Sequence, residues 1–149
     1  MSLEQNIMAD LKTAMKAKDK ASMRGIRAIK QAILLAKTDG SGKELSEVDE
    51  IKMLQKLVKQ RNESIKIYQE QSRTDLAEAE LEEVEVIMRY LPKQMDEGEL
   101  RAFVKEKIEK LGASGMKDMG KVMGACSKEL AGKADGALLS KLVKEILMA

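Results

Sequence analysis

The sequence predicts an all-α protein, and three observations carry this prediction. Apolar residues recur at the three- and four-residue spacing of a helix face along almost all of the 149 residues. Strands favour aromatic residues, yet the chain holds only two tyrosines and one phenylalanine, and a single proline. Pairs that cap helix starts, such as Ser2 with Gln5, precede several of the apolar runs. An all-β fold is therefore nearly excluded.

Four longer helices are expected before the single proline, Pro92. The residue before a proline is driven out of the helical region, so the fourth helix, from about Asp75 to Tyr90, must end near Leu91. The other starts and stops are signalled at Ser2 with Gln5, Asp19, residues 38–42, Ser46 with Asp49, and residues 72–74.

Three shorter helices are expected after Pro92. The first begins at Asp96, the second carries the apolar residues from Met116 to Leu130, and the third those from Leu139 to Leu147. Glycine-containing segments separate them. The predicted architecture is a four-helix amino-terminal domain, residues 1–92, followed by a three-helix tail domain, residues 93–149.

Charge is segregated along the chain, although the net charge is only +2. Residues 1–45 hold nine basic and five acidic side chains, and residues 101–149 hold ten and six. Residues 75–100 hold two basic and nine acidic side chains. An acidic middle thus lies between two basic ends, and this distribution is more informative than the neutral total.

The residue types give no credible active site. Histidine is absent, which excludes an imidazole base or metal ligand. Cys126 lies on the apolar side of its helix and is expected to be a buried hydrophobe without an activating base. Gly120-Lys121 and Gly132-Lys133 lack the spacing and the preceding strand of a phosphate-binding loop. No catalytic residue, metal or cofactor is therefore expected.

The chain is expected to be a cytoplasmic protein without a membrane span. No run of apolar residues approaches the 18 or so that a spanning helix needs, and no secretory signal stands at the start. A single cysteine cannot form an internal disulfide, which suits a reducing compartment.

A buried ion pair is expected between the third and fourth helices. Arg61 falls inside the apolar stripe of its helix, and Glu80 and Glu83 fall among apolar positions of theirs. A charge left unpaired in a helix interface costs several kcal/mol, so Arg61 should pair with Glu80 or Glu83.

Two cationic faces remain that a plain helical bundle does not need, although ordinary solvation also explains such faces. One lies on the second helix, at Lys20, Arg24 and Arg27. The other lies in the tail, on the side of its helix opposite the methionines. A glycine on this face would let a sugar-phosphate strand approach the helix backbone closely. Its residues are Lys117, Lys121, Gly124, Lys128 and Lys133.

Several short motifs lie along the chain in a fixed order. They are Ile26-Arg27, residues 57–65, residues 73–77, Glu80, Tyr90-Leu91-Pro92, residues 118–124 and residues 132–136. In this order and spacing the motifs resemble the YqeY-like proteins of bacteria, which are standalone relatives of the tail domain of GatB, a subunit of the tRNA-dependent amidotransferase. Lys133 departs from the pattern, since arginine is more frequent at that position.

The resemblance implies an all-α protein with a three-helix tail and a tRNA-contacting role for that tail. The expected function is a cytoplasmic, non-catalytic tRNA-binding or amidotransferase-associated module, with the tail cations as its RNA-binding face. Its expected partners are tRNA and components of an amidotransferase or synthetase. Two alternatives stay open: a protein–protein adaptor that binds no RNA, and an accessory part of a carbon–nitrogen ligase that uses glutamine as amido donor.

Overall fold

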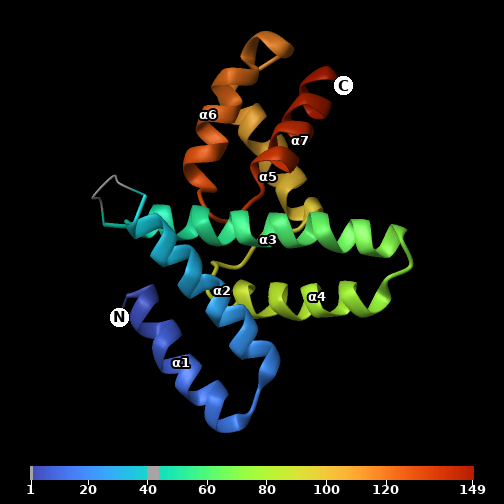
Figure 1. Ribbon diagram of the computed structural model, residues 1–149. Coiled ribbons are helices and arrows are strands. Elements are labelled where there is room, and N and C mark those ends of the chain that lie inside the picture. The colour runs from blue at the N-terminus through green and yellow to red at the C-terminus, as the bar shows by residue number, and fades with distance from the viewer. Residues whose placement is uncertain (1, 40–43) are drawn as a thin grey trace. The chain divides into compact units, whose positions relative to one another are not determined.

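The computed structural model describes residues 2–39 and 44–149, and over these residues it is entirely helical (Figure 1). It contains seven α-helices, one short 3-10 helix and, in the described ranges, no strand, which confirms the all-α prediction. No helix within those ranges has both the length and the apolar character needed to cross a membrane. The chain divides into two compact units, residues 1–92 and 93–149.

The first unit contains four helices whose starts are fixed by the capping residues that the sequence indicates. Ser2 Oγ accepts a hydrogen bond from the backbone N–H of Gln5, and Gln5 Oε1 accepts one from the backbone N–H of Ser2. Ser46 and Asp49 make the same reciprocal pair. The helices are α1 (Leu3–Ala17), α2 (Lys20–Lys37), α3 (Glu47–Glu70) and α4 (Thr74–Met88).

Two helix boundaries differ from the sequence prediction. Helix α4 ends at Met88 and not near Leu91, because residues 89–91 donate hydrogen bonds to carbonyls three residues back and tighten into turns. Residues 116–118 form the 3-10 helix η1 and not the first turn of an α-helix. Of the predicted loop at residues 38–42, residues 40–42 lie outside the described residues.

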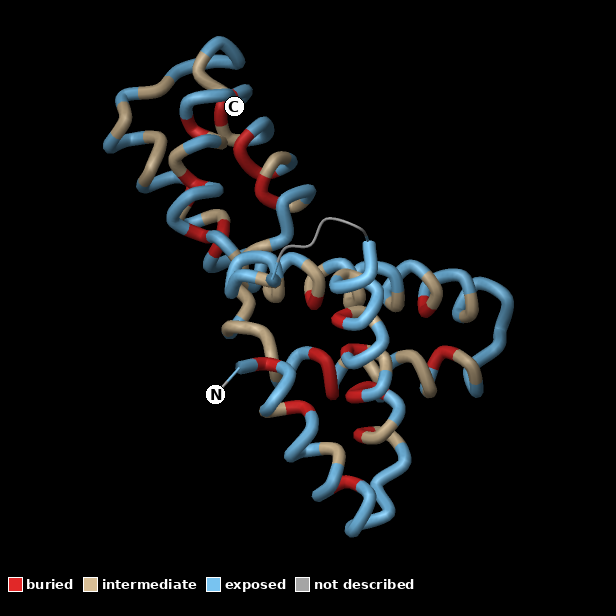
Figure 2. Tube along the Cα trace, turned by 60° about the vertical axis from the view of Figure 1, so that its left-hand side comes forward, coloured by how far each residue is buried: buried red, intermediate tan, exposed pale blue. Residues whose placement is uncertain are grey.

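Helix α2 packs against both α1 and α4 in the first unit, and α3 packs along α4. Figure 2 shows the buried residues along the facing sides of these helices. Helices α2 and α4 come very close to each other at Gly25, where an added Cβ atom would lie 2.6 Å from the Cβ of Val86. The crossing of α2 and α4 therefore requires a residue without a side chain at position 25. The largest fully buried side chains of this unit are those of Ile7, Ile26, Ile29, Leu54 and Ile87.

The second unit surrounds a core of its own, formed by Leu100, Val104, Val122, Leu142 and Val143, among others. Asp96 and Asp135 cap its first and last α-helices through hydrogen bonds from backbone N–H groups three residues on. Its elements are α5 (Glu97–Leu111), η1 (Met116–Asp118), α6 (Met119–Glu129) and α7 (Gly136–Met148).

Candidate functional site

The five predicted tail positions lie on the surface of the second unit. Lys121, Gly124 and Lys128 are exposed on α6, whereas Lys117 belongs to η1 and Lys133 to the segment between α6 and α7. A Cβ atom at Gly124 would have no atom within 4 Å. The structure thus places all five at the surface and leaves the space above Gly124 open.

Positive charge is left unbalanced in residues 116–149. All four acidic side chains there are engaged: Glu129 pairs with Lys107, Glu145 with Arg101, and Asp118 and Asp135 accept hydrogen bonds from backbone N–H groups. Among the described residues, by contrast, no lysine of this segment forms an ion pair. These six lysines are Lys117, Lys121, Lys128, Lys133, Lys141 and Lys144.

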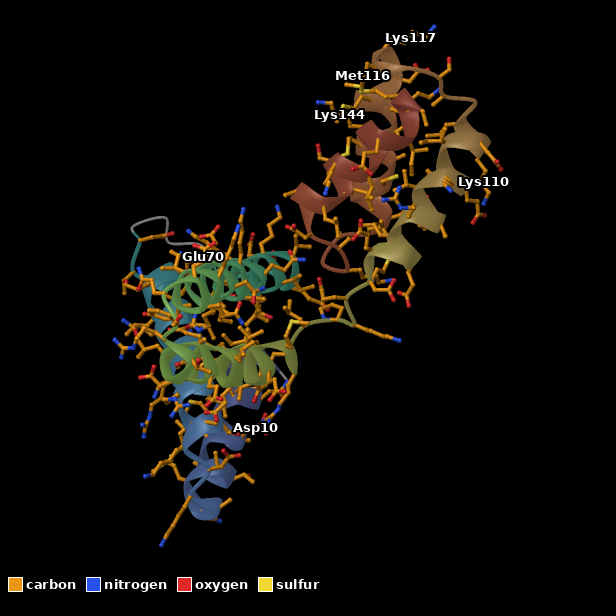
Figure 3. The ribbon with its side chains drawn as sticks, turned by 90° about the vertical axis from the view of Figure 1, so that its right-hand side faces the viewer. Asp10, Glu70, Lys110, Met116, Lys117 and Lys144 are labelled. Atoms are coloured by element: carbon orange, nitrogen blue, oxygen red, sulfur yellow. The ribbon has the colours of Figure 1, made fainter. Side chains whose placement is uncertain are left out.

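Exposed methionines accompany these lysines at one end of the second unit. Met116 is 44% exposed and Met148 is 64% exposed. Figure 3 shows Met116, Lys117 and Lys144 gathered at this end, away from Lys110, and η1 contacts α7. Met148 follows Lys144 by one helical turn on the exposed side of α7. We call Met116, Lys117, Lys144 and Met148 the Met–Lys patch.

Of the four patch residues, the sequence predicts only Lys117 as a site residue. Met116 is expected as an apolar position of its helix, and Lys144 and Met148 lie on a different helix from the predicted lysines. The spacing of Lys141, Lys144 and Met148 does indicate a shared exposed surface, because it places all three on the side of α7 opposite its core residues. Contact between η1 and α7, which brings the two pairs together, is a tertiary feature that no spacing reveals.

The predicted cationic face of α2 is partly neutralised. Lys20, Arg24 and Arg27 are exposed, as expected. However, Arg24 Nη2 lies 2.6 Å from Glu82 Oε2 on α4. Arg24 therefore links α2 to α4, and its charge is neutralised by an acidic residue of α4.

Arg61 reaches Glu83 across the interface of α3 and α4. Arg61 Nε lies 3.6 Å from Glu83 Oε2, and the two side chains are 17% and 19% exposed. Arg61 Nη1 also donates to the carbonyl of Leu57, while Nε is buried with no hydrogen-bond partner. Burial is less complete than the sequence predicts, and the water that still reaches both side chains lowers the cost of holding two charges in the interface.

Glu80 lies close enough to this pair to feel both charges, although within the described ranges it takes part in none of the ion pairs. Burial raises the pKa of Glu80 above its ordinary value of 4.5, the nearby Glu83 raises it further, and Arg61 acts in the opposite direction. The folded state therefore holds the Glu80 proton more tightly than the unfolded chain does. Ionisation of Glu80 lowers the free energy of unfolding as pH rises above 4.5.

We therefore expect Glu80→Gln to stabilise the protein at pH 7, by a few tenths of a kcal/mol, which is the usual scale for partly exposed charges. The gain should shrink toward zero at pH 4, where Glu80 is protonated in the parent. Urea unfolding at both pH values checks this, with Glu78→Gln on the exposed side of α4 as the control. A stabilisation that is equal at both pH values would show that the charge of Glu80 is not its cause.

A surface cavity of about 600 Å³ lies within the first unit, between the starts of α1 and α3 and the residues after α4. Glu50 lines it, and burial together with the neighbouring Glu47 raises the pKa of Glu50. Tyr90, which also lines it, donates a 2.5 Å hydrogen bond to Asp10, and burial and this bond raise the pKa of the phenol. The hydrogen bond ties the end of α4 to α1.

The single thiol of the chain lies in the core of the second unit. Cys126 is fully buried, and burial raises the pKa of its thiol. Those ranges contain no cluster of three or more acidic or cysteine side chains able to hold a metal ion. The arrangement offers surfaces for binding.

The model of the family described as Yqey-like protein matches residues 4–147 of the chain. The relatives share the name "Altered inheritance of mitochondria protein 41, mitochondrial". The protein of Pyrenophora tritici-repentis is 31% identical over 148 residues, which cover 96% of this chain and 80% of that protein. Those of Lachancea thermotolerans and Clavispora lusitaniae are both 38% identical, cover 58% and 72% of this chain, and are matched over only 46% and 61% of their own lengths.

These names contradict two expectations. The relatives are named as mitochondrial proteins of fungi, so the expected cytoplasmic location and the expected bacterial, GatB-like tRNA-binding or amidotransferase-associated role are wrong. A lone cysteine is compatible with any reducing compartment, and similar helical tails can bear different surfaces, since a fold does not determine its ligand. The resemblance itself is confirmed over nearly the whole length: the chain belongs to the Yqey-like protein family.

Proposed function

We propose that the chain is a protein-binding module without catalytic activity of its own, and that the Met–Lys patch of its second unit holds an acidic segment of a partner protein. One observation carries this proposal. Exposed methionines lie beside lysines that have no ion-pair partner among the described residues, at one end of a small three-helix unit.

Each component of the patch favours a polypeptide with carboxylates. Lys117 and Lys144 attract negative charge, and they are available because no neighbouring carboxylate neutralises them. Met116 and Met148 add flexible, polarisable apolar surface, which adapts to the side chains of a partner. An acidic segment with an apolar residue satisfies both, whereas a bare phosphate chain leaves the methionines in water.

The residue chemistry supports a role without catalysis. The chain contains no histidine to act as a base, and its only thiol is fully buried. The finer arrangement of a four-helix lobe followed by a three-helix tail is part of the same proposal. Its support is that the two units have separate cores with no residue in common.

A short acidic peptide tests the proposal directly. The probe is a fluorescein-labelled octapeptide of glutamates around one leucine, which is too short to form a stable helix. We expect Lys117→Gln combined with Lys144→Gln to weaken its binding about tenfold, which corresponds to about 1.4 kcal/mol. Fluorescence anisotropy with the full chain measures the dissociation constants.

The matched control removes the same charge elsewhere on the second unit. Lys105 and Lys110 lie on α5, and Figure 3 shows Lys110 apart from the patch. Lys105→Gln combined with Lys110→Gln should change the affinity less than about twofold. Equal weakening by the two double variants would mean that only net charge matters, and the patch would lose its assigned role.

A further inference from the structure

A second apolar surface lies on the α1–α2 hairpin, in the first unit. A groove of about 300 Å³ runs between the two helices, which Figure 1 shows side by side. Glu4 Oε2 and Lys37 Nζ, 2.6 Å apart, join the first turn of α1 to the last turn of α2. We call this the hairpin groove. It is lined by Glu4 of α1 and, on α2, by Arg27, Lys30, Gln31, Ile33, Leu34 and Lys37.

The groove has an apolar centre that is open to solvent. Ile33 is buried beneath it, while Leu34 is 60% exposed although it is a large apolar residue. On α1, Met8 lies four residues after Glu4 and Met15 lies seven residues after Met8, so both continue along the same side of the helix. Both methionines are exposed. The apolar strip therefore extends along the hairpin beyond the groove itself.

The rim of the groove is positive. Arg27, Lys30 and Lys37 face the single acidic residue Glu4, which Lys37 already neutralises. Arg27 and Lys30 form no ion pair within the part of the chain that the structure describes. They are three residues apart on α2 and so present two cations along one side of the groove.

We propose that the hairpin groove binds an amphipathic helix of a partner protein, whose apolar side enters the groove and whose flanking glutamates or aspartates face Arg27 and Lys30. Two helices side by side form a linear apolar channel, and a third helix is the element that fills it along its length. The positive rim selects acidic flanks by charge complementarity. This site goes beyond the Met–Lys patch and would let one chain join two partner segments.

The test uses the full chain and an 18-residue helical peptide, with leucines at alternating spacings of three and four and glutamates on both sides of the leucine stripe. Leu34→Gln should weaken its binding about tenfold. Leu35→Gln is the matched control, because Leu35 is 62% exposed on the same helix but does not line the groove. Leu35→Gln should change the affinity less than about twofold.

Two further variants separate the alternatives. Arg27→Gln with Lys30→Gln should weaken the binding of the helical peptide and make its dissociation constant less dependent on salt concentration. The glutamates of this peptide can also bind the Met–Lys patch, so all these variants are compared in a chain that carries Lys117→Gln with Lys144→Gln, which separates the two sites. The proposal is overturned if the peptide fails to bind at millimolar concentration, if Leu35→Gln weakens it as much as Leu34→Gln, or if only vesicles of anionic phosphatidylglycerol bind.

Discussion

Replacing Gly25 by alanine is expected to lower the free energy of unfolding of the first unit by about 1–3 kcal/mol, the usual cost of overpacking. The new Cβ would lie 2.6 Å from both Cβ and Cγ1 of Val86. A β-branched side chain on a neighbouring helix cannot turn away from such a contact, so α2 and α4 must move apart. This cost exceeds the gain of up to about 1 kcal/mol that alanine normally brings to a helix interior.

Gly124→Ala is the matched control, and its effect should have the opposite sign. Gly124 lies within α6, where a Cβ atom would meet no other atom within 4 Å. Alanine there should stabilise the second unit by up to about 1 kcal/mol. Circular dichroism during urea unfolding follows the helices of both units. Tyrosine fluorescence reports the first unit alone, because both tyrosines, Tyr68 and Tyr90, lie in it and the chain has no tryptophan. Unaltered stability of Gly25→Ala would refute the close crossing of α2 and α4.

Replacing Arg61 by methionine is expected to destabilise the first unit by about 2–3 kcal/mol, somewhat less than the 3–5 kcal/mol typical of a fully buried pair. The change leaves the carboxylates of Glu80 and Glu83 facing α3 without a counter-charge. Combining Arg61→Met with Glu83→Leu should recover much of the loss, because the carboxylate that pairs directly with Arg61 is then gone and only Glu80 keeps an uncompensated charge. A double-mutant cycle by urea unfolding, followed by tyrosine fluorescence, measures the coupling.

Arg73→Met supplies the comparison for this cycle. Arg73 also pairs with an acidic residue, Asp75, but both side chains are more than half exposed. Its removal should leave stability unchanged within error, because exposed pairs contribute little. If the loss of unfolding free energy in the double variant at positions 61 and 83 equals the sum of the losses in the two single variants, the side chains do not interact as described.

Local signals were sufficient to predict most of the fold. Ser2 with Gln5 and Ser46 with Asp49 make the capping boxes that the sequence indicates, since capping depends on residues three apart. The end of α4 was misplaced because Pro92 restricts only the residue before it, whereas the tightened turns begin at residue 89. The contact of Gly25 with Val86 joins residues 61 positions apart and could not be read from either helix.

The candidate site was less predictable than the fold. Exposure of Lys117, Lys121 and Lys128 follows from helical periodicity alone. Periodicity does not show which of the cations form ion pairs. Arg24, for example, pairs with Glu82 on another helix, and only the tertiary structure shows this. The ligand was predicted least well, because a family resemblance indicates the fold and its core, whereas the surface residues determine which ligand binds.

The central claim, that the Met–Lys patch binds an acidic protein segment, is tested most directly by an NMR titration of the ¹⁵N-labelled full chain with the glutamate octapeptide. We expect saturable shifts of backbone amides in η1 and in the last turns of α7, with little change around Lys110 on α5. The absence of shifts at η1 and α7 at millimolar peptide would contradict the claim. So would an RNA hairpin that shifts the same amides at lower concentration and with a steeper salt dependence than the peptide.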